Sequence, residues 1–219
     1  MSEAIVDCDA VLFDMDGTLV DSREIVERLW LRWAAEHGLS ADAILAVAHG
    51  RRTLETMQLV APHLATPEEA ARLDALEAHE EGHETAVPGA AALLSVLPPD
   101  RWAVVTSAGR KLAAARLAAV GLPVPRVLVG ADDVVLGKPS PEGYLRAAGL
   151  FGVAPERCVV MEDTPAGAQA GRAAGARVIG LRTTFPSVDG CDFLVRDLRA
   201  IRVADTLSAA PIRLMINEA

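Results

Sequence analysis

The sequence predicts an α/β fold in which a parallel sheet, covered by helices on both faces, is interrupted by an inserted helical bundle. Short apolar runs, typical of buried parallel strands, alternate with helical patterns through most of the chain. Between residues 18 and 85 the pattern is helical throughout. Four of the apolar runs are followed by polar residues, at the edge where a site is expected in such a sheet.

Five apolar runs are the candidate strands of the sheet. They are Ala10–Phe13, Trp102–Val105, Val127–Val129, Cys158–Met161 and Val178–Leu181. Four helical patterns lie between or beside them, at Gly89–Leu97, Arg110–Val120, Pro141–Phe151 and Ala166–Ala174. Strands that alternate with helices in this way form right-handed βαβ units, so we expect all five strands to run parallel.

The inserted segment contains four further helical patterns. They are Arg23–His37, Ala41–Ala48, Thr53–Val60 and Pro67–Glu84. Ser22, Ser40 and Thr66 are the residue types that cap helix N-termini, and they stand before three of these helices. We therefore predict a core domain of residues 1–17 and 86–219 and an inserted helical domain of residues 18–85. The tail 202–219 is weakly patterned, with a candidate short strand at Ile212–Ile216.

Composition and charge exclude several classes of protein. The chain has 219 residues, of which 51% are hydrophobic and 23% charged, as in ordinary globular proteins. A formal net charge of −9 argues against a nucleic-acid partner, which needs a basic surface. The three cysteines form no disulfide pattern, and the sequence shows neither a signal peptide nor an apolar stretch of membrane-spanning length. We expect a cytoplasmic protein without a membrane partner.

The first candidate motif, Asp14-Met15-Asp16-Gly17-Thr18, directly follows the first predicted strand. One carboxylate can attack a substrate and bind a metal, while the other donates a proton to the leaving group and later takes one from water. Gly17 permits a backbone tight enough to bring both around one small ligand. The same D-x-D-G pattern is also common in turns with solvated carboxylates, and the motif alone leaves both interpretations open.

Three further motifs follow later strands. Thr106 and Ser107 can hold a phosphoryl oxygen or simply cap the next helix. Lys138, one of only two lysines beside nineteen arginines, can pair with a carboxylate and a phosphate or lie solvated on the surface. Glu162 and Asp163 are oxygen donors suited to Mg²⁺, although an acid at the start of a helix also compensates its dipole.

The four motifs indicate a common site when they are considered together. Because the carboxyl ends of parallel strands share one edge of the sheet, these residues are expected to meet there. Together they would supply a nucleophile, an acid/base, a phosphate clamp and a seat for a metal ion. Such a set suits phosphoryl transfer, which depends on positioning and charge neutralisation.

DMDGT (14–18), TS (106–107), KP (138–139) and ED (162–163) resemble, in order and spacing, the four motifs of the haloacid dehalogenase (HAD) superfamily. The resemblance covers essentially the whole chain, and it implies a Rossmann-like core with an inserted helical cap. It implies that Asp14 is the nucleophile that forms an aspartyl-phosphate and that Asp16 is the general acid and then base. It further implies phosphate binding by Thr106, Ser107 and Lys138. The implied Mg²⁺ ligands are Asp14, Asp16 through its backbone carbonyl, and Asp163, with Glu162 in support.

The cap contains the segment His49-Gly50-Arg51-Arg52, which lies between two predicted helices. With neighbouring residues it resembles bacterial sugar-phosphate phosphatases and fungal glycerol-3-phosphate and 2-deoxyglucose-6-phosphate phosphatases. Those arginines can bind hydroxyls or a second anionic group of a substrate, or they can be solvated. Trp30 and Trp33 are expected in the core of the bundle. The resulting hypothesis is a Mg²⁺-dependent phosphatase for a small phosphorylated sugar or polyol.

Two alternative functions stay open. A mutase similar to β-phosphoglucomutase would share all four motifs, but such a family carries a His in its first cap helix, near the position of Val26 here. A non-catalytic binding module on the same fold would usually lack Asp14, Asp16 or Asp163, and all three are present. The sequence contains no sustained heptad pattern, and we expect a monomer or a weak homodimer.

Overall fold

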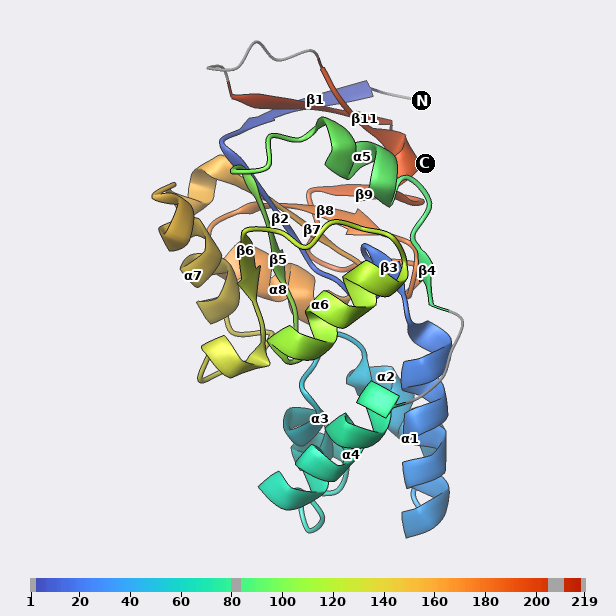
Figure 1. Ribbon diagram of the computed structural model, residues 1–219. Coiled ribbons are helices and arrows are strands. Elements are labelled where there is room, and N and C mark those ends of the chain that lie inside the picture. Colours follow the sequence, from blue (N-terminus) through green and yellow to red (C-terminus); the bar gives the residue numbers. More distant parts are fainter. Residues whose placement is uncertain (1–2, 80–83, 205–210, 218–219) are drawn as a thin grey trace.

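The computed structural model describes residues 3–79, 84–204 and 211–217. Its centre is a six-stranded parallel sheet with the strand order β6-β5-β2-β7-β8-β9 (Figure 1). Its strands are β2 (Ala10–Phe13), β5 (Trp102–Val105), β6 (Val127–Val129), β7 (Cys158–Glu162), β8 (Arg177–Leu181) and β9 (Phe193–Val195). The α/β prediction and its five strands are confirmed. Strand β9 was not predicted, because no helix separates it from β8 and the alternation of strands and helices therefore gives no signal for it.

Two layers of helices cover the sheet. Helices α5 (Ala90–Val96) and α6 (Arg110–Ala119) share a core with Val11 and Phe13 of β2. On the opposite face, α7 (Glu142–Phe151) and α8 (Pro165–Ala173) pack with Ala10 and Leu12 of the same strand. Successive residues of β2 therefore point to opposite faces, and both faces are apolar because both are buried.

A second, antiparallel sheet lies at the end of the molecule opposite the helical bundle (Figure 1). Its strand order is β1-β11-β10, with β1 at Glu3–Cys8, β10 at Ile201–Val203 and β11 at Ile212–Asn217. The strand expected at Ile212–Ile216 is β11, whereas β1 and β10 were not predicted. The pairing of β1 with β11 joins segments about as far apart in sequence as the chain allows, so no local pattern reveals it.

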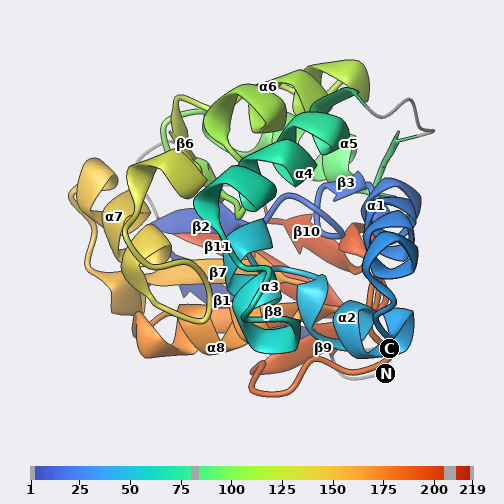
Figure 2. The same cartoon turned by 90° about the horizontal axis from the view of Figure 1, so that it is seen from below.

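The inserted segment folds as four helices beneath the carboxyl edge of the parallel sheet (Figures 1 and 2). They are α1 (Arg23–His37), α2 (Ala41–Ala48), α3 (Thr53–Val60) and α4 (Pro67–His79). Their apolar faces form a core of their own around Trp30 and Trp33, whose rings meet edge to face at 5.5 Å. Both tryptophans are thus core residues, as expected. None of the helices in the described part of the chain has the length and apolarity needed to cross a lipid bilayer.

The ends of these helices test the capping predictions. Ser40 and Thr66 accept hydrogen bonds from the backbone N–H groups of Ala43 and Glu69, at 3.3 and 3.1 Å. Ser22 does not cap α1, and that prediction is wrong: its hydroxyl donates instead to Asp16 at 2.6 Å. The predicted extension of α4 to residue 84 is also wrong at its end, because Glu84 directly precedes β4 in non-helical backbone; residues 80–83 lie outside the described residues.

A short ribbon connects the bundle to the core. Strands β3 (Val20–Asp21) and β4 (Thr85–Ala86) pair antiparallel, so the chain leaves the core and returns to it through the same two-stranded element. An isolated bridge also joins Asp16 to Val20 at the base of this ribbon. The domain boundaries 1–17, 18–85 and 86–219 stay a prediction.

Candidate active site

The carboxyl ends of neighbouring strands bring the predicted residues together. Asp14 directly follows β2, Thr106 follows β5, and Asp163 follows β7, the other neighbour of β2. Lys138 lies in the segment between β6 and α7 and reaches the same place from the far side of β5. Asp14, Thr106, Lys138 and Asp163 are all buried. Residues that are widely separated in the chain thus form one cluster, and the parallel topology accounts for it.

Lys138 is the cation of this cluster. Its ammonium donates to Asp14 Oδ1 and, at 2.6 Å, to Glu162 Oε1. Burial would lower the pKa of Lys138, but the charges of Asp14 and Glu162 outweigh it and hold the pKa well above its usual value. Lys138 is therefore positively charged at neutral pH, and a compact ammonium lies directly beside the candidate nucleophile.

Glu162 holds Lys138 in place. Its carboxylate, which is fully buried, accepts five hydrogen bonds: from Lys138 and the Tyr144 hydroxyl on Oε1, and from Asp163 N, Thr164 N and Thr164 Oγ1 on Oε2. The ring of Tyr144 lies 5.3 Å from the ammonium, close enough for a cation–π contact. The role of Tyr144 was not predicted, although it is the only tyrosine of the chain and lies within a predicted helix.

Asp14 and Asp163 each keep one buried carboxylate oxygen, Oδ2, that has no hydrogen-bond partner among the described residues. The other oxygen of Asp163 accepts a 2.9 Å hydrogen bond from Thr18. Burial raises the pKa of Asp14 well above its usual value, and burial together with the Glu162 charge raises the pKa of Asp163 to about 7. Buried, unpaired carboxylate oxygens are costly unless a cation compensates them.

These observations fit a divalent cation. Among the described residues, Asp14, Glu162 and Asp163 each offer an oxygen within 4.8 Å of the others. Hard carboxylate oxygens are the ligands that Mg²⁺ prefers. Gly17 allows the loop to pass this close, since its φ is +84° and an added Cβ would collide with the Asp163 carboxylate. Because both Glu162 oxygens already accept hydrogen bonds, the two Oδ2 atoms are the better placed ligands.

Asp16 lies beside this cluster at the wall of a cavity of about 970 Å³, which is lined by both the core and the bundle. Its Oδ1 accepts hydrogen bonds from Ser22 at 2.6 Å and from Arg116 Nη1 at 2.9 Å. Asp14 and Thr106 line the same cavity. The contact with Arg116 was not predicted, because nothing in the predicted helix Arg110–Val120 sets Arg116 apart and its partners are distant in sequence.

Comparison with known proteins decides the family. Residues 8–175 match the family described as "Hydrolase: haloacid dehalogenase-like hydrolase". Hexitol phosphatase A of Escherichia coli (strain K12) is 43% identical over 203 residues, which cover 90% of this chain and 94% of that protein. The chain belongs to the HAD family. The predicted resemblance is confirmed.

Two further similarities support this membership. Glycerol-1-phosphate phosphohydrolase 2 of Saccharomyces cerevisiae is 35% identical over 211 residues, covering 89% of this chain and 84% of that protein. A hydrolase from Pseudomonas syringae has a similar structure, with a TM-score of 0.75 at 27% identity, covering 87% of this chain and 94% of its own. This HAD chain is therefore an enzyme, a phosphoric monoester hydrolase.

The cap residues of the HAD chain form hydrogen bonds with the core that the sequence did not predict. Ser107, expected to bind phosphate, donates its hydroxyl to Gly50 O at 2.9 Å. Arg51 reaches Lys138 O at 3.4 Å, and Arg52 reaches Val135 O at 2.9 Å. These guanidinium groups therefore fasten the cap to the core segment that carries Lys138.

His49 and Gly50 occupy the same junction between cap and core. The His49 ring packs edge to face on Phe185 at 5.9 Å and lies 3.7 Å from Glu27. Gly50 has a φ of +78°, and an added Cβ would collide with Thr164. The cap loop therefore fits tightly against the start of α8. His49, Gly50, Arg51 and Arg52 all line the cavity of this HAD enzyme, so contact with a substrate stays a prediction for them.

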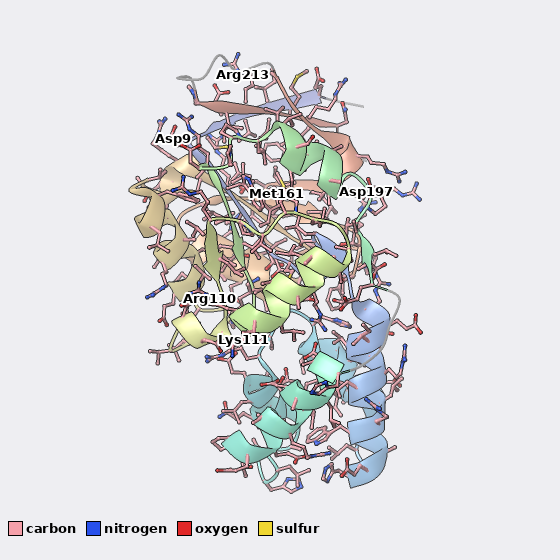
Figure 3. All side chains as sticks on the ribbon, viewed as in Figure 1. Asp9, Arg110, Lys111, Met161, Asp197 and Arg213 are labelled. Atoms are coloured by element: carbon pink, nitrogen blue, oxygen red, sulfur yellow. The ribbon has the colours of Figure 1, made fainter. Side chains whose placement is uncertain are left out.

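Two other cations line the cavity of the HAD enzyme, and neither was predicted as a substrate contact. Arg23, the first residue of α1, has a buried Nε without a hydrogen-bond partner in the described part of the chain. Lys111 lies at the end of α6 that is nearest the bundle (Figure 3). Both therefore line the same cavity as Asp14.

Proposed function

We propose that this HAD phosphatase hydrolyses the phosphate monoester of a small sugar or polyol through a covalent phosphate on Asp14, with Mg²⁺ as its cofactor. The observation that carries the proposal is the buried Asp14 carboxylate, which contacts Lys138, lies near Asp163 and lines the cavity of about 970 Å³. Hexitol phosphatase A and glycerol-1-phosphate phosphohydrolase 2 act, by their names, on phosphorylated polyols, which supports the substrate class.

The proposed reaction has two displacement steps. In the first, an Asp14 oxygen attacks phosphorus, the bond from phosphorus to the ester oxygen breaks, and Asp16 gives its proton to the leaving alcohol. In the second, Asp16 takes a proton from water, the water oxygen attacks phosphorus, and the bond to Asp14 breaks to release phosphate. Asp16 thus ends each cycle protonated again.

The surrounding residues neutralise and orient the phosphoryl group. Lys138 supplies a fixed positive charge, and Glu162 and Tyr144 hold its ammonium beside Asp14. Thr106 would donate its hydroxyl to a phosphoryl oxygen. Ser107 could do the same only by giving up the hydrogen bond that its hydroxyl donates to Gly50 O. Asp14, Asp163 and the Asp16 backbone carbonyl would hold Mg²⁺, which supplies further charge neutralisation when bound. We assign Glu162 to the orientation of Lys138 rather than to direct ligation.

A substrate panel tests the proposal. The purified chain is incubated with phosphorylated sugars, polyols and short acids, with Mg²⁺ or with a chelator, and phosphate release is ranked by kcat/KM. We expect Mg²⁺-dependent release that is fastest for polyol or sugar monophosphates. Release that is unaffected by the chelator would contradict the cofactor assignment, and no release from any ester would support the non-catalytic module.

The mutase alternative has its own test in the same panel. Val26 lines the cavity near the position where the resemblance to the mutases places their histidine. A valine cannot assist proton transfer, which favours water as the acceptor of the phosphoryl group. Conversion of β-glucose 1-phosphate into glucose 6-phosphate, measured before any phosphate appears, would favour the mutase instead.

Replacing Asp16 is expected to harm poor leaving groups most. Asp16→Ala should lower kcat/KM for glycerol phosphate by about 10² to 10⁴-fold, because the alkoxide then leaves without a proton. The loss for p-nitrophenyl phosphate should be about tenfold or less, since nitrophenolate needs no proton to leave. The control is Asp21→Asn, an exposed carboxylate in β3. Equal losses on both substrates would contradict the proton-donor role.

Replacing the cap arginines is expected to change substrate preference. Arg51→Ala and Arg52→Ala each remove hydrogen bonds between cap and core, so we expect kcat/KM for polyol phosphates to fall by about 3- to 10-fold. Hydrolysis of p-nitrophenyl phosphate should change less, because its ring has no hydroxyl groups that the cap residues could bind. Arg202→Ala, in the second sheet, is the control. An unchanged ranking of substrates would count against a cap role.

A further inference from the structure

Arg116 is a buried arginine that joins three segments of the chain. It belongs to α6 of the core and is 3% exposed. Its three nitrogens contact three different carboxylates: Nη1 contacts Asp16 at 2.9 Å, Nη2 contacts Glu77 at 2.9 Å, and Nε contacts Glu84 at 2.8 Å. Glu77 lies on α4 of the cap, so its ion pair with Arg116 bridges the cap and the core, and Glu84 directly precedes β4.

The charges of this cluster favour a permanently ionised guanidinium. Burial would lower the pKa of Arg116, but Asp16 and Glu77 reverse the effect and raise it. Burial raises the pKa of Glu77, and Arg116 opposes that rise. One buried cation therefore serves carboxylates of both the cap and the active site. An arginine suits this place because its planar fork offers donors in fixed directions.

We propose that Arg116 is a positioning residue that couples the seating of the cap to the orientation of Asp16. This role rests on the proposed function, in which Asp16 exchanges the proton. Ser22 and Arg116 both bind Oδ1 of Asp16, so the carboxylate is oriented with Oδ2 available for a substrate. Arg116 is itself fixed by Glu77 and Glu84. When the cap moves away, Glu77 leaves with α4 and the guanidinium loses one of its anchors.

The functional consequence is that Asp16 donates its proton efficiently only when the cap lies against the core. A cap that lies against the core excludes bulk water from the cavity. In the same position, Glu77 holds the Arg116 guanidinium that orients Asp16. Displacement of a catalytic group by about 1 Å can cost on the order of 10²-fold in rate. Arg116 thus acts through Asp16, and its effect should follow the need of the leaving group for a proton.

The test compares Arg116→Gln and Glu77→Gln on glycerol phosphate and p-nitrophenyl phosphate. For Arg116→Gln we expect kcat on glycerol phosphate to fall by about 10²-fold and kcat on p-nitrophenyl phosphate by about 5-fold or less. Glu77→Gln leaves the pair of Arg116 with Asp16 in place, so its loss should be smaller, with the same dependence on leaving group. The matched control is Arg72→Gln, since Arg72 also pairs with two carboxylates, Glu36 and Glu69, but within the cap.

A double-mutant cycle distinguishes positioning from a merely structural role. In an Asp16→Ala background, Arg116→Gln should have little further effect on glycerol phosphate hydrolysis, because the group that it orients is already absent. Additive losses, or equal losses on both substrates, would overturn the inference. If Arg116→Gln does not fold, as checked by circular dichroism, the same cycle with Glu77→Gln decides.

Different results would contradict the proposed function and the role of Arg116. Wild-type protein that releases no phosphate from any ester contradicts the proposed function. Wild-type hydrolysis together with the expected leaving-group effect of Asp16→Ala, but without one for Arg116→Gln and Glu77→Gln, contradicts only the role of Arg116.

Discussion

Asp14→Asn should fold normally and lose at least about 10⁴-fold in kcat on every phosphate ester, including p-nitrophenyl phosphate. An amide is a far weaker nucleophile than a carboxylate, and no good leaving group can compensate for the absence of the attacking atom. Lys138 would keep Glu162 as a charged partner at 2.6 Å, so the ammonium would not be left alone in the core.

Two measurements check this expectation. Steady-state assays give the loss of turnover, and rapid acid quenching followed by mass spectrometry detects phosphate bound to the wild-type chain but not to the variant. Asp9→Asn is the matched control, because Asp9 lies immediately before the same strand and pairs with Arg157 on the surface. Substantial turnover by Asp14→Asn, or phosphate found on another residue, would disprove the assignment of the nucleophile.

Lys138→Met should lose both activity and stability. The ammonium contacts two buried carboxylates, Asp14 and Glu162, and its removal leaves them without a cation. Breaking a buried pair in this way costs about 3–5 kcal/mol in the free energy of unfolding. Turnover should fall by at least about 10²-fold, because the developing charge on the phosphoryl group then lacks its fixed counter-charge.

The loss of stability should depend on pH in a defined direction. Burial already raises the pKa of Asp14 in the folded state, and without Lys138 this pKa rises further. A carboxyl group whose pKa is raised by folding favours the folded state at low pH, where it is protonated, and disfavours it once the pH exceeds the folded pKa. The difference in unfolding free energy between wild type and Lys138→Met should therefore be largest at neutral pH and shrink as the pH falls.

Urea unfolding at neutral pH and at about pH 5 measures this difference. Lys111→Met, a change of the other lysine of the chain at an exposed position, is the control for stability and should be nearly neutral. A difference that grows toward low pH, or an equal loss of stability for both variants, would contradict the buried ion-pair network around Lys138.

The sequence predicted those parts of the fold and site that local patterns encode. Asp14 and Thr106 directly follow apolar runs and Asp163 lies two residues beyond one. The rule that parallel strands share one carboxyl edge is enough to bring the three together. Lys138 stood out because lysine is rare in this chain. These expectations needed only periodicity and the position of polar residues relative to strands.

What the sequence did not predict depends on contacts between distant segments. Strand β1 pairs with β11 across nearly the full length of the chain. The role of Arg116 depends on its contacts with Glu77 and Asp16, which are distant in sequence, and not on its neighbours in α6. Ser22 had the right residue type for a cap, but its hydroxyl is turned toward the Asp16 carboxylate, to which it donates. Its backbone, with φ −109° and ψ 8°, also lacks the extended conformation of a capping residue. In each of these cases the partner of the strand or side chain is determined by tertiary structure.

The separate apolar core of the cap has a consequence for product release. Because Trp30, Trp33 and their neighbours pack among themselves, swinging the bundle about the β3–β4 ribbon would expose little of either hydrophobic core. The interactions that this motion breaks are mainly polar, such as the hydrogen bonds of Ser107 with Gly50 and of Arg52 with Val135. Water can replace the neutral bond of Ser107 at a net cost of about 0.5–1.5 kcal/mol and the charged bond of Arg52 at about 1.5–3 kcal/mol. The buried ion pair of Glu77 with Arg116 is the most costly contact that the motion would break. We therefore expect that products could leave the cavity without partial unfolding of either core.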